Sequence, residues 1–576
     1  MGLLNSALHI GRTALLGYQG ALQVIGNNIS SAGTENYTRL SPQLSPLQGD
    51  TLTGNLKPGA GVALSGIQRN IDEALESRVR LAIGSVQAND AQRAALLRIE
   101  QTFSDLSGAD IGSRLTNFFN SFEDLQNRPD DTATRELVLA AGTQLAGALL
   151  TARTALIDVG DDIDGQIVGL VESADNIAGR IARLNEEITV AEAGTRSQAT
   201  GLRDQRDTLL RELSQIFDVT VREQPNGALN VYIGSEALIQ GNFVRGLIAV
   251  TQSDGTFNHT TARFADTNQQ IDITGGQLAG LISSRDVHAF GRIDSIDQLA
   301  AAIIAEVNRV HADGQGFVGY ESLTGAVNVL ATNAGLTDPA TGLASAVQDG
   351  SFYITVIDEL TKTPVAFQIN VVVGSPGGNT TLESLVSDIN AQVEGLTASV
   401  TSDNRIAFEA DDGLSFVFGY DGQQARTDSS GVLTALGVNT FFTGSDARNM
   451  AVNQTILEQS LLIAASAVSL PGEGSNAGRI AGIDIVGSAS LGGSTIPDFY
   501  RSIVNAVAVT TRASIEAEES SSAILASLNA QKGSISGVNL DEEAISLLKF
   551  ERAFQGASRY ISSVSRMLDE LILLIR

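Results

Sequence analysis

Residues 547–575 read LLKFERAFQGASRYISSVSRMLDELILLI, and their apolar positions recur at alternating steps of three and four residues. A heptad repeat of this kind places one apolar seam along a helix, and the seam is stable only when a second helix covers it. Residues 4–29 carry a matching repeat near the other end of the sequence. Two unrelated helices in separate parts of the fold are the alternative, but matched repeats at both ends favour one paired coiled coil. The predicted assembly seam consists of Leu4, Leu8, Leu15, Tyr18, Leu22, Ile25, Ile29, Leu547, Phe550, Phe554, Ala557, Ile561, Val564, Leu568 and Leu571.

Length and composition exclude several classes of site and partner. A chain of 576 residues is too long for one core, and about three or four domains are expected. The formal net charge of −28 argues against a nucleic-acid partner and against an anionic membrane surface, because both bind basic patches. The absence of cysteine excludes disulfides, zinc–thiolate sites and a cysteine nucleophile.

The sequence also predicts how the chain relates to membranes. No apolar run approaches the ~18 residues of a membrane span, so we expect no membrane insertion. Residues 1–21 lack the basic start and the unbroken apolar core of a cleaved secretory signal. If the protein works outside the cell, we expect it to leave by a route that uses no cleaved signal.

Hydrophobic periodicity predicts a mainly α-helical protein with inserted β modules. Helical repeats return after each β-rich stretch, which indicates a discontinuous helical rod domain. Gly and Pro punctuate the segment after the first helix and favour an extended, loop-rich linker. The predicted domains are a terminal coiled-coil domain (1–35 with 536–576), the extended linker (36–71), the helical rod domain (72–216, 275–323 and 439–535), a small β-rich domain (217–274) and an α+β outer insertion (324–438).

Some local patterns give more specific expectations. Residues 219–233 predict a hairpin with a two-residue Asn-Gly turn, and residues 406–418 predict another across their Asp-Asp-Gly sequence. The acidic cluster at 161–165 is expected to cap the start of a helix that is separate from one at 132–156. Residues 447–467 are expected to be helical.

No group of residues predicts catalysis or ligand binding. The four histidines are never three or four residues apart, so a helical His pair for a metal is absent. His259 and His311 are expected to be isolated surface side chains. The sequence has no phosphate-binding loop and no nucleophile elbow, and paired acids such as Asp411 and Asp412 stand at turn positions. We therefore expect no enzyme activity, no catalytic residues, no cofactor and no metal site.

The residues beside the terminal helices form two motifs. Asparagines follow the first helix, where they tolerate the left-handed conformation that stops helices. Before the last helix, an asparagine is placed as the N-cap, and Glu542 lies three residues on, as in a capping box. The motif residues are Asn27, Asn28, Thr34, Tyr37, Asn539, Leu540, Asp541 and Glu542.

These motifs resemble the terminal signatures of bacterial flagellar axial proteins. Residues 536–543, followed by FQGASR at 554–559, are similar to the C-terminal signature of the hook-associated protein 1 family, the first hook–filament junction proteins. LRDQRD at 202–207 and LGVNTFFTGSD at 436–446 also resemble that family. The chain departs from the family's usual residues at Ser30-Ser31, Glu35-Asn36 and Phe554, without altering the helix pattern.

The resemblance implies a structural subunit at the hook–filament junction of the flagellum, located outside the cell. It implies a ring of copies that polymerises through its terminal helices and contacts hook protein and the next hook–filament junction protein. It also implies termini that are disordered until assembly, and an export chaperone that binds the C-terminal helix. The paired terminal helices would form an inner tube wall, with the β insertions facing outward.

Other functions fit the sequence less closely. The nearest alternative is another axial protein, such as hook protein or the second junction protein. A glycan-binding or adhesin protein would use residues 324–438 as its active part. An enzyme such as a wall hydrolase would need two carboxylates that the fold brings together.

Overall fold

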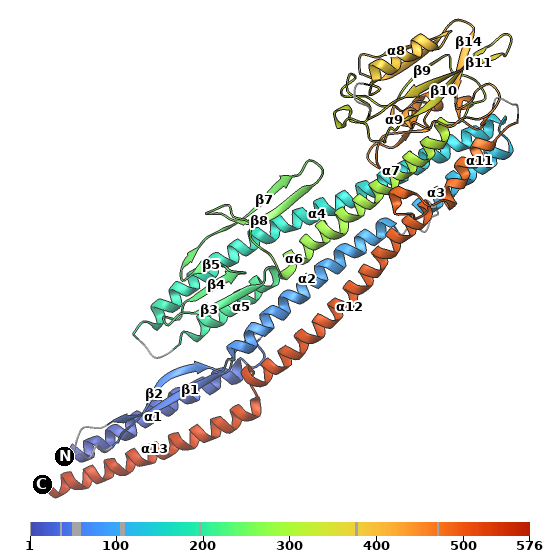
Figure 1. The fold of residues 1–576 in the computed structure, drawn as a ribbon. Coiled ribbons are helices and arrows are strands. Elements are labelled where there is room, and N and C mark those ends of the chain that lie inside the picture. Colours follow the sequence, from blue (N-terminus) through green and yellow to red (C-terminus); the bar gives the residue numbers. More distant parts are fainter. Residues whose placement is uncertain are drawn as a thin grey trace. The chain divides into compact units, whose positions relative to one another are not determined.

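The computed structural model describes residues 2–34, 37–48, 59–103, 110–194, 198–374, 378–468 and 472–575, with only the backbone of residues 2–4, 574 and 575. These residues form long helices and small antiparallel sheets, which confirms the predicted fold class (Figure 1). None of the described helices combines the length and the apolar character needed to cross a membrane. The chain divides into two compact units: unit 1 comprises Met1–Ala95, Asp161–Ser284 and Arg512–Arg576, and unit 2 comprises Leu96–Gly160 and Arg285–Thr511. The five-part division given above stays a prediction.

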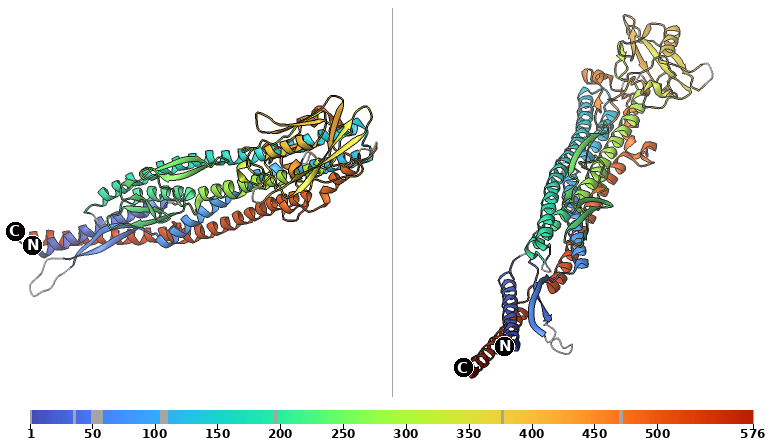
Figure 2. Two further views of the ribbon diagram at one scale, coloured as in Figure 1. Left: turned by 45° about the horizontal axis from the view of Figure 1, so that its top comes forward. Right: turned by 90° about the vertical axis from the view of Figure 1, so that its left-hand side faces the viewer.

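The first and last helices lie side by side within unit 1. Helix α1 (Gly2–Ser30) packs along α13 (Leu540–Ile575), and the N and C labels lie together in every view of Figures 1 and 2. The two helices are antiparallel, because Tyr18 contacts Phe550 with ring centroids 6.4 Å apart, whereas the earlier Gly11 faces the later Ile561. The predicted pairing of the terminal helices is therefore confirmed.

The segment expected to be an extended linker forms a hairpin in its described part. Strand β1 (Leu40–Gln48) pairs antiparallel with β2 (Gly59–Arg69), whereas residues 36 and 49–58 lie outside the described residues. The hairpin packs on α1, where a Cβ at Gly20 would come within 2.8 Å of Leu64 Cδ2. The loop-rich prediction is wrong here because glycines on the helix, rather than alternation within the strands, make the packing surface.

One helix, α4 (Thr132–Glu192), replaces the two helices expected around residues 161–165. Val159, Ile163 and Ile167 are buried at helical spacing straight through the acidic cluster. This continuous apolar stripe outweighs the cost of Asp and Gly in a helix interior, which is about 1 kcal/mol or less per residue. Asp164 caps no helix start; its carboxylate accepts a hydrogen bond from Thr260 N–H at 3.2 Å. The N-cap prediction is therefore wrong.

The hairpin expected at 219–233 is present in unit 1, with Val219 opposite Ile233. Its turn differs from the expected Asn-Gly pair: Gly227 N–H donates to the Gln224 carbonyl at 3.0 Å, so Pro225 and Asn226 occupy the central positions. The other elements of unit 1 are α2 (Glu73–Phe103), α5 (Thr200–Ile216), α6 (Gly276–Ser283), α12 (Ile496–Ser536), the sheet β3 (Val219–Glu223), β4 (Leu229–Ile233), β5 (Glu236–Gln240) and β6 (Phe243–Val244), and the hairpin β7 (Leu247–Ser253) and β8 (Asn258–Phe264). Some residues of α2, α4 and α12 belong to unit 2.

The α+β insertion in unit 2 has a buried core of its own. Its strands form two sheets, in the orders β11-β10-β14 and β12-β13-β9. Residues 406–418 supply β13 to one sheet and β14 to the other, so the hairpin expected across them is wrong. Both of those strands are apolar, but Phe408 and Phe416 meet with ring centroids 5.9 Å apart as core contacts between sheets, not as partners in one ladder. The elements of unit 2 are α3 (Ile111–Asn127), α7 (Phe290–Ala312), β9 (Ser322–Thr324), β10 (Gly350–Asp358), β11 (Pro364–Val371), α8 (Leu382–Gln392), β12 (Leu396–Val400), β13 (Ile406–Ala410), β14 (Leu414–Phe418), α9 (Val432–Ala435) and α11 (Ser475–Ala481).

Residues 447–467 form short elements instead of the expected helix. Strand β15 (Phe442–Thr443) pairs with β16 (Ala451–Val452), and the short helix α10 (Gln454–Glu458) follows. Within this range, the Asn453 side chain accepts from Thr455 N–H and donates to the Thr440 carbonyl, each at 3.1 Å. Such side-chain bonds to the backbone compete with helix formation, which explains the failure of a prediction based on periodicity alone.

Buried polar side chains close the C-terminal end of α7. Asn439 Nδ2 donates to the carbonyls of residues 311, 312 and 314, some of which a helix end leaves unpaired. His311 is fully buried, so the expectation of a surface side chain is wrong. Its Nε2 accepts from Ala464 N–H at 3.0 Å, which leaves Nδ1 to donate to the Asn439 carbonyl at 2.8 Å. The ring is therefore held neutral.

Acid is expected to destabilise unit 2 through His311. Burial lowers the pKa of His311 from 6.5 to about 4, so between these values the unfolded chain takes up a proton that the folded chain refuses. The contribution is complete above pH 6.5 and falls by about 3 kcal/mol as the pH drops to 4. Hydrogen exchange at Ala464 across this range measures it. His311→Gln should flatten the profile and His259→Gln should not; an unchanged slope in His311→Gln would contradict the assignment.

Candidate functional site

The seam between α1 and α13 is only partly covered by this pair. Ile25 and Val564 are 2% and 1% exposed, whereas Ile29 and Leu571 are each 37% exposed. The remaining seam side chains are half-buried: Leu8, Leu15, Tyr18, Leu22, Leu547, Phe550, Phe554, Ala557, Ile561 and Leu568. The side chain of Leu4 lies outside the described residues. Half-burial means that each of these side chains keeps apolar surface that a further helix could cover.

Beside the seam, a buried hydrogen-bond cluster joins the two ends of the chain. Asn28 and Glu543 are 1% and 2% exposed, and Asn28 Nδ2 donates to Glu543 Oε2 at 3.0 Å. Asn28 also pairs with the backbone of Leu40, donating to its carbonyl and accepting from its N–H. Arg39 forms ion pairs with Glu543 and Glu542, each at 2.7 Å. We call these side chains, with Tyr37, the terminal joint.

Tyr37 completes the terminal joint as a donor. Its hydroxyl donates to Asn28 Oδ1 at 2.9 Å. Burial and the carboxylates of Asp204 and Glu543 raise the pKa of Tyr37 to about 12, so the hydroxyl keeps its proton at neutral pH. Asn28 thereby binds Tyr37, Leu40 and Glu543 at once, which fixes the path of the chain as it leaves α1.

A short break between α12 and α13 turns the chain at the joint. Gly537 N–H donates to the Gly533 carbonyl at 3.1 Å, and a Cβ at Gly537 would fall 2.3 Å from that oxygen, so only glycine fits. Asn539 caps α13 by accepting from Asp541 N–H at 3.0 Å. The predicted capping box is wrong, because the Glu542 side chain pairs with Arg39 instead of the Asn539 backbone.

Removing the charge of Glu543 is expected to loosen the joint. In Glu543→Gln, Arg39 loses an ionic partner, and the new NH2 group must face a donor, either Asn28 Nδ2 or Arg39 Nε, which costs about 2 kcal/mol. Hydrogen exchange of the amides in α1 and the first turns of α13 measures the loss. Glu551→Gln, on the exposed side of the same helix, is the matched control. Equal protection in both variants would show that the cluster does not hold the ends together.

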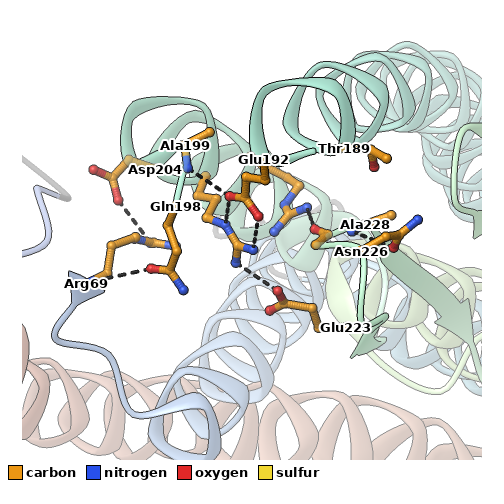
Figure 3. Close-up of polar contacts among 12 residues, drawn as sticks. Arg69, Thr189, Glu192, Gln198, Ala199, Asp204, Glu223, Asn226 and Ala228 are labelled. Carbon is orange, nitrogen blue, oxygen red and sulfur yellow. Dashed lines mark hydrogen bonds and ion pairs between the residues drawn. The ribbon is translucent and has the colours of Figure 1, made fainter. Parts of the chain in front are cut away.

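A second polar cluster ties β2 to α5. The side chain of Arg69 is 5% exposed and binds Asp204 at 2.9 Å and Asp207 through the same nitrogen. The Arg69 backbone N–H also donates to Gln198 Oε1 at 3.4 Å (Figure 3). The hairpin that packs on α1 is therefore anchored at its far end by carboxylates of α5.

The segment LRDQRD supplies the arginines of this cluster as well as its acids. Arg203 forms ion pairs with Glu192 at 2.7 Å and Glu223 at 2.8 Å (Figure 3). Arg206 is 1% exposed and donates to Asn185 Oδ1 at 2.9 Å and to the Gly227 carbonyl at 2.7 Å. These bonds fasten α5 to α4 and to the β3–β4 hairpin, so the motif has a structural role in unit 1.

The motif residues divide into two groups. Asn28, Tyr37 and Glu542 meet in the joint and Asn539 caps α13, whereas Asn27, Thr34, Leu540 and Asp541 are exposed and do not join the cluster. The sequence-based site missed Arg39 and Glu543. The sequence does contain a signal for them. Glu543 lies four residues before Leu547, at the next position of the heptad seam, and an acid buried there requires a cation such as Arg39 as its partner.

The acidic side chains and the cavities of the described residues bear on metal and ligand binding. No three His, Asp or Glu side chains among them gather to hold a metal ion. A cavity of about 620 Å³ lies in unit 2, and no histidine lines its described walls. Its charged side chains serve local structure: Lys362 pairs with Glu359, and Glu473 accepts hydrogen bonds from backbone N–H groups.

Two family models match parts of the chain, and several known proteins are similar to it over nearly its whole length. Residues 96–325 match the model of the flagellar hook-associated protein FlgK helical domain, and residues 532–574 match that of the flagellar basal body rod FlgEFG protein C-terminal region. Flagellar hook-associated protein 1 of Escherichia coli is 26% identical, with 99% of each chain covered. The proteins of the same name from Salmonella typhimurium and Bacillus subtilis are 24% and 21% identical, with 99% and 98% of this chain covered and 100% and 97% of theirs.

A solved structure agrees with the fold. The flagellar hook junction protein FlgK from Burkholderia pseudomallei superposes with a TM-score of 0.52 at 14% identity, covering 80% of this chain and 100% of that one. Sequence similarity from end to end, the helical-domain match and the shared fold point to one assignment. The chain is therefore similar over nearly its whole length to flagellar hook-associated protein 1, a structural component of the flagellum.

Proposed function

We propose that this chain is the subunit that connects hook to filament, and that it polymerises through its terminal helices. The observation that carries the proposal is similarity over 99% of the chain to a relative named flagellar hook-associated protein 1. The half-buried seam supports it physically, because apolar side chains left partly uncovered in one copy are stabilised when neighbouring copies cover them.

The proposed contacts follow from this position. Copies form a ring in which the terminal helices (1–35 with 536–576) make the inner wall, with hook protein on one side and the next junction protein on the other. An export chaperone binds the C-terminal helix before assembly and shields its apolar side chains. Leu571, Ile572 and Leu573 are 37%, 51% and 70% exposed, which gives such a chaperone an apolar surface.

Electron microscopy of cells that lack this chain tests the proposal, with the medium assayed for flagellin. We expect bare hooks and flagellin lost to the medium, both restored by the wild-type chain. Missing hooks would move the assignment to a rod or hook protein. Normal filaments would remove the junction role and revive the adhesin and enzyme alternatives.

A further inference from the structure

The cavity of about 620 Å³ in unit 2 has a buried cation in its wall. This cation is Arg135, which lies in the first turn of α4 and is 1% exposed. Its Nε donates to the Pro129 carbonyl at 2.9 Å. Its Nη1 donates to the Ile463 carbonyl at 2.8 Å and to the carbonyls of residues 460 and 461, each at 3.3 Å. These bonds hold the guanidinium group in one place.

The third nitrogen of the guanidinium group is left without a partner. Nη2 donates to no atom of the described residues, and Arg135 forms no ion pair with any of them. Nη2 is also not one of the described side-chain atoms that are both fully enclosed and unbonded, so it borders open space. Because Arg135 lines the cavity, Nη2 offers its two N–H donors there. A buried charge in a folded protein is normally paired, so these donors indicate a ligand that brings an acceptor oxygen.

The acids that line the cavity have other partners. Glu359 pairs with Lys362, and Glu473 accepts from backbone N–H groups. Asp130 accepts from a backbone N–H at 3.1 Å. Burial lowers the pKa of Arg135 to about 10, against the smaller opposing effect of Asp130. The described residues therefore leave the charge of Arg135 largely uncompensated.

Much of the remaining wall is apolar. Phe317, which is 53% exposed, lines the cavity together with Val318, Pro364, Val417 and Tyr420. The volume lies within the range of about 300–1,000 Å³ that is usual for small-molecule sites. The wall therefore suits a small molecule with an apolar body and one acceptor group.

We propose that this cavity binds a monocarboxylate with an apolar body, whose carboxylate accepts from Arg135 Nη2 while the apolar part contacts Phe317. A carboxylate is favoured over a neutral oxygen because a hydrogen bond between two charged groups is about twice as strong as a neutral one. A phosphate ester would bring a further negative charge close to Asp130, which the same cavity wall disfavours. The proposal is independent of the terminal helices and of the junction role.

Binding of phenylbutyrate to the full-length chain tests the proposal, with phenylbutyramide as the neutral ligand of the same shape. We expect the acid to bind about tenfold more tightly than the amide, because only the acid forms a charge-assisted bond. Arg135→Gln should reduce this ratio to about one. Phe317→Ala should weaken both ligands by about tenfold, because it removes apolar contact area. Phe243→Ala, at a position 60% exposed in unit 1, is the matched control and should leave both affinities unchanged.

Photoaffinity labelling tests the location in the wild-type chain, so it does not depend on the folding of Arg135→Gln. The chain is irradiated with a benzoate that carries a diazirine, and the labelled peptides are identified by mass spectrometry. We expect labels within residues 315–319 and 357–364, removed by phenylbutyrate at a concentration at which the amide has no effect. Equal affinities of acid and amide, no binding of either ligand, or labels confined to other segments would each overturn the proposal.

A peptide identifies the source of the carboxylate. A tripeptide that ends in a free phenylalanine carboxylate and binds more tightly than phenylbutyrate would support the site as a receptor for a protein C-terminus. Weaker binding of the tripeptide would support a free organic acid as the ligand. The bare-hook phenotype judges the junction role separately, because it does not depend on this cavity.

Discussion

Replacing Ile561 by aspartate is expected to abolish assembly while both units stay folded. Ile561 lies in the middle of the seam, where its side chain fills the space left by Gly11, and a Cβ at Gly11 would come within 2.4 Å of Ile561 Cγ1. Aspartate there places an unpaired charge against apolar side chains, and burying even a neutral polar group without a partner costs about 2–7 kcal/mol. In cells producing only this variant we expect bare hooks and flagellin in the medium.

The far-UV circular dichroism of the purified variant separates loss of the seam from general unfolding. We expect the far-UV helical signal to fall by no more than the fraction of it that the two terminal helices contribute. Val190→Asp, at a position 72% exposed on α4, is the matched control and should leave filaments normal. Filaments of normal number with Ile561→Asp, or loss of the entire helical signal, would defeat the prediction.

Replacing Arg203 by methionine is expected to cause the largest loss of stability in unit 1. The arginine is 7% exposed and pairs with both Glu192 and Glu223, so its removal leaves two carboxylates with no direct ionic partner and only the electrostatic influence of Arg206 (Figure 3). Removing one partner of a buried ion pair costs about 3–5 kcal/mol. The glutamates are 15% and 38% exposed, which places the expected loss at the lower end, about 3 kcal/mol.

Urea unfolding measures the loss of stability, and hydrogen exchange of the backbone amides in β3 and β4 shows where it occurs. Arg183→Met, exposed on α4, provides the control and should change stability by less than about 0.5 kcal/mol. A further substitution of Glu192 by glutamine should recover part of the loss, because it removes one of the stranded charges. A variant as stable as wild type would show that the cluster is fully solvated and contributes little.

The helical parts of this fold were predictable because their signal is periodic and long. The heptads that include Tyr18 and Phe550 identified the pair of terminal helices from sequence alone. The β1–β2 hairpin was missed because its packing surface lies on α1, at residues such as Gly20, and not in its own pattern. The strands at 406–418 were recognised, but their partners were not, because pairing depends on distant segments.

The joint shows the same limit for the candidate site. Asn28 and Glu542 were identified by resemblance, yet the side chains that complete the cluster, Arg39 and Glu543, are ordinary charged residues in sequence. Only the meeting of the two chain ends gives them buried partners. Likewise, His311 looked isolated because Asn439 and Ala464 approach it from far along the chain.

Because α1 pairs with α13, only a copy that contains both helices can form the seam. The contact between Asn28 and Glu543 spans 515 residues of sequence. A copy cut short by premature termination or by a protease anywhere before α13 keeps its first helix but has nothing to close against it. If copies polymerise through these helices as proposed, such a fragment cannot present the shared seam, and we expect it to stay out of the growing structure.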